Sequence, residues 1–389
     1  MALTLAMLIF IAGMARQCMP VLFKEIAAEL NLDLVAIGVV WGVDPLAGIF
    51  VAIPGGLLID RIGVKRTMAG VCILCGVFGA LRGFAGGFGT MAFYMFLFGL
   101  AASLVMSLSP KVTAMWFSGR YLGLTNALIW IALYVGQMIG AMFSATYFSP
   151  WLGGWREVLF VIGIPAVLIG ILWVMVKMPN KHEEESFQSE ARGFRETLLH
   201  VVRIRDVWLI AIIFMTQMGV LNATNGYIPL FLRNMGWNGV AADGAFTLSL
   251  GMGCIGTIPL VMLSNRLRAR KLFLFLGILM LSVGIGSLMF VRDAGVWVVL
   301  SVTGLIRAVG PVILNMLLIE TKGIGSQYAG TAFGVMTGCG LLAAFILPPV
   351  GNSLATINPG LPFVFWGAVG VLCLISLRFL GRPQRSVSA

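Results

Sequence analysis

The stretch GGLLIDRIGVKRT, residues 55–67, decides the fold because it sets an aspartate and a cluster of basic side chains directly behind an apolar run. The 389-residue chain around it is 59% hydrophobic and 11% charged, with a mean hydropathy of +1.00. Apolar runs of about 20 residues in such a chain are typical of membrane-spanning helices. The charged stretch is therefore expected to be a short loop between two spans.

Charged, Gly-rich and Pro-rich breaks divide the rest of the chain into twelve apolar segments. The expected spans are 3–28, 35–59, 67–88, 91–110, 120–148, 156–177, 207–232, 241–264, 271–291, 295–319, 326–354 and 362–380. The first segment lacks the basic start of a signal peptide and is predicted to be a span. We therefore expect an all-α membrane protein with twelve transmembrane helices.

Only one connection, residues 178–206, is both long and polar. It predicts two six-helix bundles, residues 1–177 and 207–389, joined by a cytoplasmic linker. The segments 123–140 and 330–345 resemble each other at an offset near 207 residues, which indicates a duplicated, pseudo-symmetric unit. Repeats of this kind are typical of transporters.

The formal net charge of +11 comes mostly from Lys and Arg in the short connections between spans. With the N-terminus inside, about nineteen of them fall on the cytoplasmic side and about four outside, which is the asymmetry of the positive-inside rule. The charge thus predicts orientation in the bilayer, with both termini cytoplasmic in the inner or plasma membrane, and does not predict a nucleic-acid partner. We also expect a monomer.

Nothing in the chain indicates an enzyme, a metal site or a cofactor. Both histidines, His182 and His200, lie in the linker, and no Ser, Cys, Asp and His set converges at one depth. The six cysteines fall inside apolar segments, so we expect free, packed thiols.

The pattern from Gly56 to Arg66, placed between spans two and three, resembles the signature loop of the major facilitator superfamily. The resemblance implies two bundles that work by alternating access, and a conformational latch in this loop. The latch residues are Gly56, Asp60, Arg61, Gly63, Lys65 and Arg66. In the family the carboxylate of Asp60 is expected to meet the N-terminus of helix eleven near residues 326–330, where it is favourable by about 0.3–1 kcal/mol. Tyr328, beside that point, is a candidate gate.

Four ionisable residues fall well inside spans: Arg16, Asp44, Arg82 and Arg307. A charge at the bilayer centre costs about 2.5–3.5 kcal/mol, so each needs a partner, water or a substrate. Arg307 lies near the midplane of span ten with no acidic residue of its own half at that depth, which favours an anionic ligand. Arg16 lies in MARQCMPVLFKEIAAEL, which resembles helix one of organic-anion symporters. The two arginines could clamp one carboxylate.

Asp44 and Arg82 lie at similar depths, which predicts an ion pair inside the first bundle. Asp44 could instead neutralise Arg16 when no substrate is bound, or carry a proton. Glu320 is a second candidate for proton coupling.

Polar side chains at helical spacing predict the rest of the substrate site, although for each of them an interhelical hydrogen bond is an equally good explanation. Span seven is expected to be kinked or unwound around Gly226. The candidates are Asn126, Trp130, Tyr134 and Gln137 in span five, Gln217, Asn222, Asn225 and Tyr227 in span seven, Asn315 in span ten and Thr331 in span eleven.

The combined prediction is a transporter that takes up a small organic anion together with protons, because the membrane potential opposes entry of an uncompensated anion. Two alternatives stay open. An efflux antiporter for drugs or other hydrophobic compounds would want an intramembrane carboxylate without compensating arginines. A sensor built on the same scaffold would show no transport.

Overall fold

The computed structural model describes residues 2–51, 62–117, 120–175, 194–267, 269–307 and 309–380. Within them, twelve helical segments are long and apolar enough to cross a membrane. This confirms the predicted twelve-span, all-α architecture. The six cysteines are free thiols.

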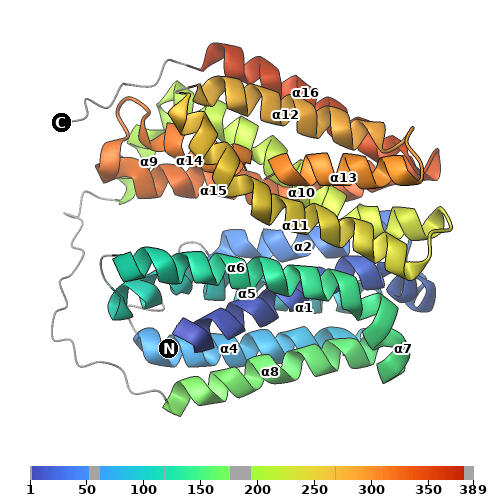
Figure 1. The fold of residues 1–389 in the computed structure, drawn as a ribbon. Coiled ribbons are helices and arrows are strands. Elements are labelled where there is room, and N and C mark those ends of the chain that lie inside the picture. Colours follow the sequence, from blue (N-terminus) through green and yellow to red (C-terminus); the bar gives the residue numbers. More distant parts are fainter. Residues whose placement is uncertain are drawn as a thin grey trace.

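The first six spans form one bundle, drawn below the other in Figure 1. Their helices are α1 (Ala2–Leu30), α2 (Leu34–Val51), α4 (Val64–Leu81) with the turn η1 (Arg82–Phe84), α5 (Phe88–Trp116), α6 (Arg120–Phe143) continued by η2 (Ser144–Phe148) and α7 (Ser149–Leu152), and α8 (Trp155–Met175).

The last six spans form the second bundle, preceded by the short helix α9 (Phe194–Val202). They are α10 (Arg205–Asn234), α11 (Gly239–Arg266), α12 (Arg270–Ser287), α13 (Ala294–Ile306) with α14 (Val309–Ile319), α15 (Gly325–Ser353) continued by η3 (Leu354–Thr356), and α16 (Leu361–Phe379). The predicted boundaries at residues 177 and 207 stay predictions.

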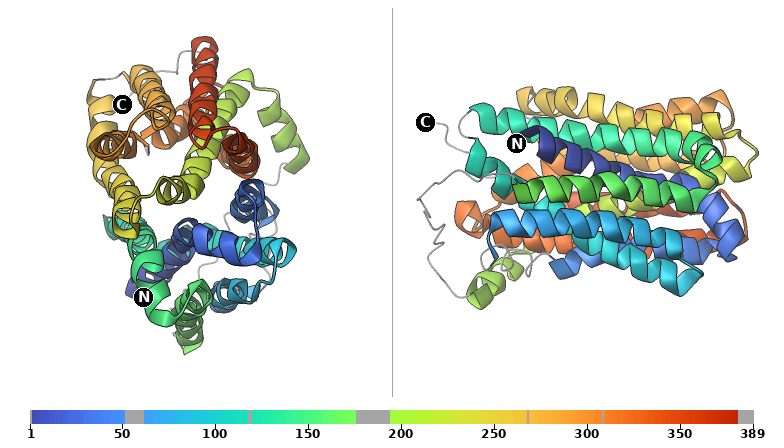
Figure 2. Two further views of the ribbon diagram at one scale, coloured as in Figure 1. Left: turned by 90° about the vertical axis from the view of Figure 1, so that its right-hand side faces the viewer. Right: turned by 90° about the horizontal axis from the view of Figure 1, so that it is seen from below.

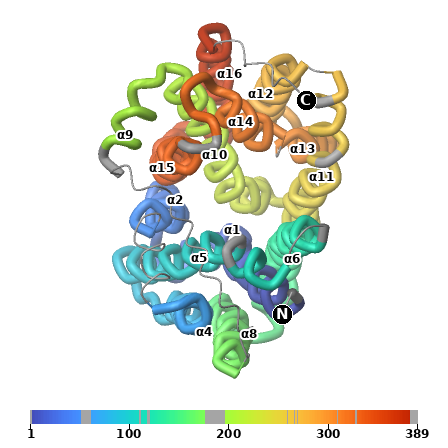
Figure 3. Tube along the Cα trace, turned by 90° about the vertical axis from the view of Figure 1, so that its left-hand side faces the viewer, coloured from blue at the N-terminus to red at the C-terminus, as the bar shows by residue number. Residues whose placement is uncertain are grey.

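Helix α1 begins and helix α16 ends on the same side of the molecule (Figure 1). We call this the terminal side, and the opposite side, where α1 ends at Leu30 and α2 begins at Leu34, the far side. Figure 2 views the far side in its left panel, and Figure 3 views the terminal side.

The two bundles meet along two seams, α2 against α15 and α6 against α11 (Figure 3). Glycines of α2 make the first seam tight: a Cβ at Gly38 would lie 2.7 Å from the Cα of Pro349, and one at Gly42 would lie 2.6 Å from the carbonyl oxygen of Phe345. Both positions are in the half of α2 nearer the far side. Small residues allow such close backbone approach between membrane helices.

Polar contacts also join the bundles on the far side. Lys24 Nζ donates to the backbone oxygen of Arg233 at 3.2 Å, and the amide of Asn352 donates to the backbone oxygen of Leu34 at 2.8 Å. The far side is thereby closed between the bundles.

Toward the terminal side the helix surfaces are open at several glycines. Among the described residues, a Cβ built at Gly123 of α6, or at Gly330, Gly334 or Gly338 of α15, would have no atom outside its own helix neighbourhood within 4 Å. Within the part of the chain that the structure describes, the seam contacts of α2 and α15 therefore end along the length of α15.

Span seven is not unwound at Gly226, because α10 is one continuous helix through it, and the kink offered as the alternative stays a prediction. Gly226 serves close packing instead: a Cβ there would lie 2.5 Å from Cδ1 of Trp41 in α2. The broken span is the tenth, where α13 ends at Ile306 and α14 begins at Val309.

Candidate functional site

Arg16 and Asp44 form a two-pronged ion pair inside the first bundle. Arg16 Nη2 donates to Asp44 Oδ1 at 2.8 Å, and its Nε donates to Oδ2. The Asp44 side chain is 2% exposed and that of Arg16 is 34% exposed. Pairing of the two charges offsets the free-energy cost of burying them within the membrane. Arg16 is thus neutralised by its own bundle while part of its surface stays accessible.

The predicted ion pair of Asp44 with Arg82 is wrong. Arg82 is fully buried and donates from Nε to the backbone oxygen of Gly79 and from Nη1 to that of Ala15, each at 3.0 Å. Its guanidinium also lies 4.0 Å from the centroid of the Phe98 ring. The short turn η1 directs this side chain into the bundle core, which residue depth along the sequence does not reveal. Arg82 is therefore a packed cation bound by backbone oxygens and an aromatic face.

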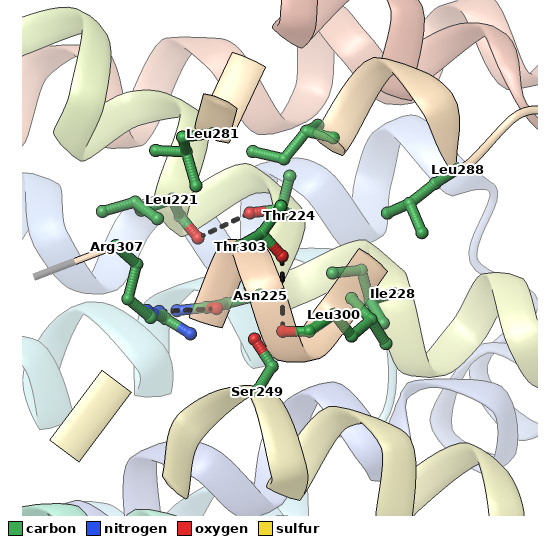
Figure 4. Close-up of a pocket in the computed structure, with 11 residues that line it drawn as sticks. Leu221, Thr224, Asn225, Ile228, Ser249, Leu281, Leu288, Leu300, Thr303 and Arg307 are labelled. Atoms are coloured by element: carbon green, nitrogen blue, oxygen red, sulfur yellow. Dashed lines mark hydrogen bonds between the residues drawn. The ribbon is translucent and has the colours of Figure 1, made fainter. Parts of the chain in front are cut away.

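Arg307 occupies the break between α13 and α14. Its Nη2 donates to Oδ1 of Asn225 in α10 at 2.9 Å (Figure 4). Among the described residues, no carboxylate lies within ion-pairing distance of it. Arg307 therefore keeps an uncompensated positive charge in the second bundle.

A small cavity adjoins Arg307 and Asn225 (Figure 4). Its walls are leucine and isoleucine side chains together with Thr224, Ser249 and Thr303. The two threonine hydroxyls donate to backbone oxygens of their own helices. The volume is about 20 Å³, which holds about one water molecule. An organic acid does not fit in this cavity as it stands, so a ligand of Arg307 must approach from the boundary between the bundles.

On the side of the first bundle, the helix next to Arg307 is α6. The side chain of Tyr134 in α6 is within electrostatic range of Arg307. A Cβ at Gly253 of α11 would lie 3.0 Å from Cδ of Arg307, so α11 holds the arginine stem from the other side. The guanidinium thus lies where the second bundle faces span five of the first.

The polar stripe of α6 lies between two packing faces. Towards α1, Cβ atoms at Gly136 and Gly140 would lie 2.0 and 2.6 Å from the backbone oxygens of Phe10 and Met14. Towards α11, Met138 lies 3.1 Å from the Cβ position of Gly251. Successive residues of a helix are rotated by about 100°, so the face towards α1 and the face towards α11 leave one arc of α6 between them that carries the polar stripe. Its members are Asn126, Trp130, Tyr134 and Gln137.

The opposite arc of α6 carries large apolar side chains that are exposed, which is the composition of a lipid-facing surface. These are Leu124, Leu128, Ile131 and Val135. The stripe therefore faces the space between the bundles, and Trp130, 54% exposed, is its most exposed large side chain. Asn126 is partly engaged, since it accepts from the Thr113 hydroxyl at 3.1 Å.

The predicted residues of α10 are mostly used for packing. The Asn222 amide donates to the backbone oxygen of Ala344 at 2.9 Å. Gln217 is 4% exposed and packs on Gly310, where a Cβ would lie 2.2 Å from its Nε2. Only Asn225 contacts Arg307.

Tyr227 lies in the core of the second bundle, which corrects its assignment as a substrate ligand. It is 2% exposed, its hydroxyl donates to the backbone oxygen of Pro359 at 2.9 Å, and its ring packs with Phe363 and Trp366. A tyrosine whose hydroxyl and ring are both satisfied in this way stabilises the bundle.

The remaining candidates of the second half have no contact with Arg307 among the interactions of the described residues. Asn315 in α14 and Thr331 in α15 are half-buried. Glu320 forms an ion pair with Arg270 just after α14 ends. Tyr328 packs its ring on that of His200 in α9, with centroids 4.3 Å apart. The assignments of Glu320 to proton coupling and of Tyr328 to a gate stay predictions.

Part of the predicted latch, Gly56, Asp60 and Arg61, lies outside the described residues. Gly63 precedes α4 with φ of +85°, a left-handed conformation that glycine adopts without strain. Lys65 and Arg66 lie in the first turn of α4.

The sequence did not indicate two of the contacts between the bundles. Trp41 Nε1 donates to the backbone oxygen of Asn222 at 2.7 Å. On the far side, Thr146 Oγ1 donates to Oδ2 of Asp243 at 2.5 Å, and Asp243, fully buried, pairs with Arg233 at 2.6 Å. Asp243 lies close to the start of its span, and the sequence does not distinguish a buried carboxylate at that position from one exposed to water at the end of a helix.

The family model of the Major Facilitator Superfamily matches residues 5–348. The chain belongs to the Major Facilitator Superfamily.

Curated relatives within the superfamily are named for organic acids. The chain is 29% identical to the probable galactarate/D-glucarate transporter GarP of Escherichia coli (strain K12), over 43% of this chain but only 40% of that protein. It is 25% identical to the 3-(3-hydroxy-phenyl)propionate transporter of the same strain, over 95% of this chain and 92% of that protein. The match thus spans less than half of GarP.

Among solved structures, the D-xylose-proton symporter superposes with a TM-score of 0.80 at 16% identity, covering 100% of this chain and 99% of that one. At this identity the likeness shows the fold alone.

Proposed function

We propose that the protein takes up a small organic anion by alternating access and that protons accompany the anion. The observation that carries the proposal is Arg307, a membrane-embedded guanidinium held by one amide oxygen, with no carboxylate of the described residues beside it. A cation in that position gains most from an anionic ligand, since planar guanidinium groups bind carboxylates through two hydrogen bonds. The relatives named for galactarate/D-glucarate and for 3-(3-hydroxy-phenyl)propionate agree with this ligand class.

Arg16 is the proposed second contact to the substrate. It is partly exposed although it is paired with Asp44. A substrate carboxylate that replaced Asp44 at Arg16 would join the two bundles through one ligand, and a proton would neutralise the displaced Asp44. This arrangement supports coupling between anion binding and closure.

The contacts between the bundles support alternating access. They close the far side, whereas the glycine surfaces of α6 and α15 toward the terminal side are open. With the orientation that the Lys and Arg distribution predicts, the terminal side is cytoplasmic. The conformation is then inward-facing, and the latch loop belongs to the opposite state.

Energetics favour coupling to protons. Entry of an anion against a negative-inside potential costs about 2.3 kcal/mol per charge per 100 mV. One accompanying proton removes this cost for a monoanion. Uptake should therefore respond to a pH gradient.

Uptake of a panel of carboxylates into proteoliposomes tests the proposal, with Arg307→Ala, Arg16→Ala and the parent protein side by side. We expect saturable uptake, stimulated by an inward proton gradient, that falls at least about tenfold in both variants. Export of cationic dyes that survives Arg307→Ala would favour the efflux alternative. Binding without flux for every compound would favour a sensor.

A further inference from the structure

The side chains near Arg307 differ in how much of their surface is still available to a ligand. Asn225 is held by Arg307, and Asn126 accepts a hydrogen bond from Thr113. Asn222 is bound to α15. Three of the six candidate amides are thus already engaged in hydrogen bonds within the protein.

The large surface that remains available on α6 is aromatic. Trp130 and Tyr134 are four residues apart, so they lie about 6 Å apart along one face of the helix. This face points into the space between the bundles, since both neighbouring arcs of α6 pack on α1 and α11. Trp130 is 54% exposed there. An indole left half-uncovered on the polar side of a membrane helix offers a flat apolar face to a ligand.

The order of these groups along α6 also matters. Tyr134 is the member of the stripe within electrostatic range of Arg307, and Trp130 lies one helical turn from it toward the terminal side. A carboxylate bound to Arg307 therefore places the rest of a short molecule over Tyr134 and then Trp130.

We propose that the transported anion is an aromatic carboxylate, whose carboxylate binds Arg307 and whose ring stacks on Trp130 beside Tyr134. This inference rests on the proposed function and adds the class of substrate and the residue that selects it. Aromatic pairs contribute about 0.5–1.5 kcal/mol beyond the burial of apolar area. Trp130 thus determines specificity, and Arg307 supplies the anion contact common to all acids.

Three probe acids separate the inference from the proposed function: 3-phenylpropionate, its saturated analogue 3-cyclohexylpropionate, and galactarate. We expect the parent protein to take up 3-phenylpropionate with the highest kcat/KM, because only this acid combines one carboxylate with a π face. Preferred uptake of galactarate, or equal uptake of the aromatic and saturated acids, would overturn the aromatic assignment and leave organic-anion transport standing. Failure of all organic anions would remove both.

Variants at Trp130 provide the second arm. Trp130→Leu should lower the preference for 3-phenylpropionate over 3-cyclohexylpropionate by about two- to tenfold, while Trp130→Phe should keep most of it. Trp151, which is 80% exposed in α7 at the far side, gives the matched control: Trp151→Leu should leave the preference unchanged. Thermal unfolding of each purified variant confirms that it is folded. A preference that Trp130→Leu leaves intact would contradict stacking on this residue.

Discussion

Without a ligand, Arg16 and Arg307 differ in the side chains to which they donate hydrogen bonds. Arg16 has a full carboxylate partner, whereas Arg307 has an amide oxygen. An incoming anion therefore competes with Asp44 at one arginine and meets no competitor of like charge at the other. Under the proposed function, Arg307 is the first contact of the anion and Asp44 is the group that takes up the proton.

Replacement of Asp44 by asparagine tests that role. Asp44→Asn leaves Arg16 without a negative partner and removes the only carboxylate beside it among the described residues. We expect uptake of anions that no longer responds to an inward proton gradient, while exchange of internal for external substrate continues. Gradient-driven accumulation that persists in Asp44→Asn would assign the proton to another group.

Arg82 makes a structural prediction at the same scale. Hydrogen bonds that involve a charged group contribute about 1.5–3 kcal/mol, and Arg82 donates two of them inside the first bundle. Arg82→Ala should lower the free energy of unfolding by about 2 kcal/mol or more, measured by thermal or denaturant unfolding in detergent. Arg292→Ala, at an exposed position, is the control. Equal stability of Arg82→Ala and the parent would show that desolvation of the cation cancels its bonds.

The sequence predicted which charges lie within the membrane and left Arg82 and Arg16 open as partners of Asp44, and the structure has the pair with Arg16. Depth follows from counting residues along a helix, and Asp44 and Arg82 do lie in neighbouring helices of one bundle. Pairing depends on the direction of each side chain around its helix axis and on the turn that ends α4. That turn directs Arg82 toward Ala15, and Asp44 is left for Arg16.

At the scale of elements, helices α2 and α15 show how glycine positions control the contact between bundles. Gly38 and Gly42 bring backbone against backbone near the far side, while Gly334 and Gly338 of α15 face open surface. The seam is therefore tight at one end only. The same residue type serves packing in one segment and leaves room for movement in another.

A side chain at Gly42 should prevent closure of the far side. In Gly42→Val the Cβ alone would stand 2.6 Å from the carbonyl oxygen of Phe345, so α2 and α15 must separate. We expect longer distances between spin labels at Asp33 and Thr356, both at the far-side ends of these segments, with reduced transport. Gly334→Val, at an unoccupied surface, is the control. Unchanged label distances in Gly42→Val would mean that the seam adapts without opening.

The number and approximate positions of the spans could be predicted, because they depend on the length of the apolar runs. All twelve spans follow from it, including the tenth. The break within the tenth span at Arg307 was not predicted, although Pro311 is a signal for it. Proline has no N–H to donate to the backbone oxygen four residues earlier, which is that of Arg307. Conversely, Gly226 suggested a break in α10, but its missing side chain accommodates Trp41 from the other bundle. A glycine in a sequence does not say which of these uses applies.

For the whole molecule, two bundles and their family could be predicted, whereas the bonds between the bundles could not. Trp41 and Asn222 are 181 residues apart in the chain and Thr146 and Asp243 are 97 apart. Such pairs become neighbours only when one bundle docks on the other. Because each pair joins helices of different bundles, no pattern within a single helix records it.

The far-side contact of Thr146 with Asp243 gives the last prediction. Thr146→Val removes two hydrogen bonds between the bundles, the one that Thr146 Oγ1 donates to Asp243 and the one that it accepts from Arg233 Nη2 at 3.4 Å. The ion pair of Asp243 with Arg233, both in the second bundle, stays intact. A hydrogen bond to a charged group is worth about 1.5–3 kcal/mol, so its loss should raise the population open on the far side by about tenfold or more. Accessibility of a single cysteine introduced at Asn222 to a membrane-impermeant reagent measures this population. Thr90→Val, whose hydroxyl bonds only within its own turn, should leave accessibility unchanged. Equal labelling of Thr146→Val and the parent would mean that the seam of α2 and α15 closes the far side without these bonds.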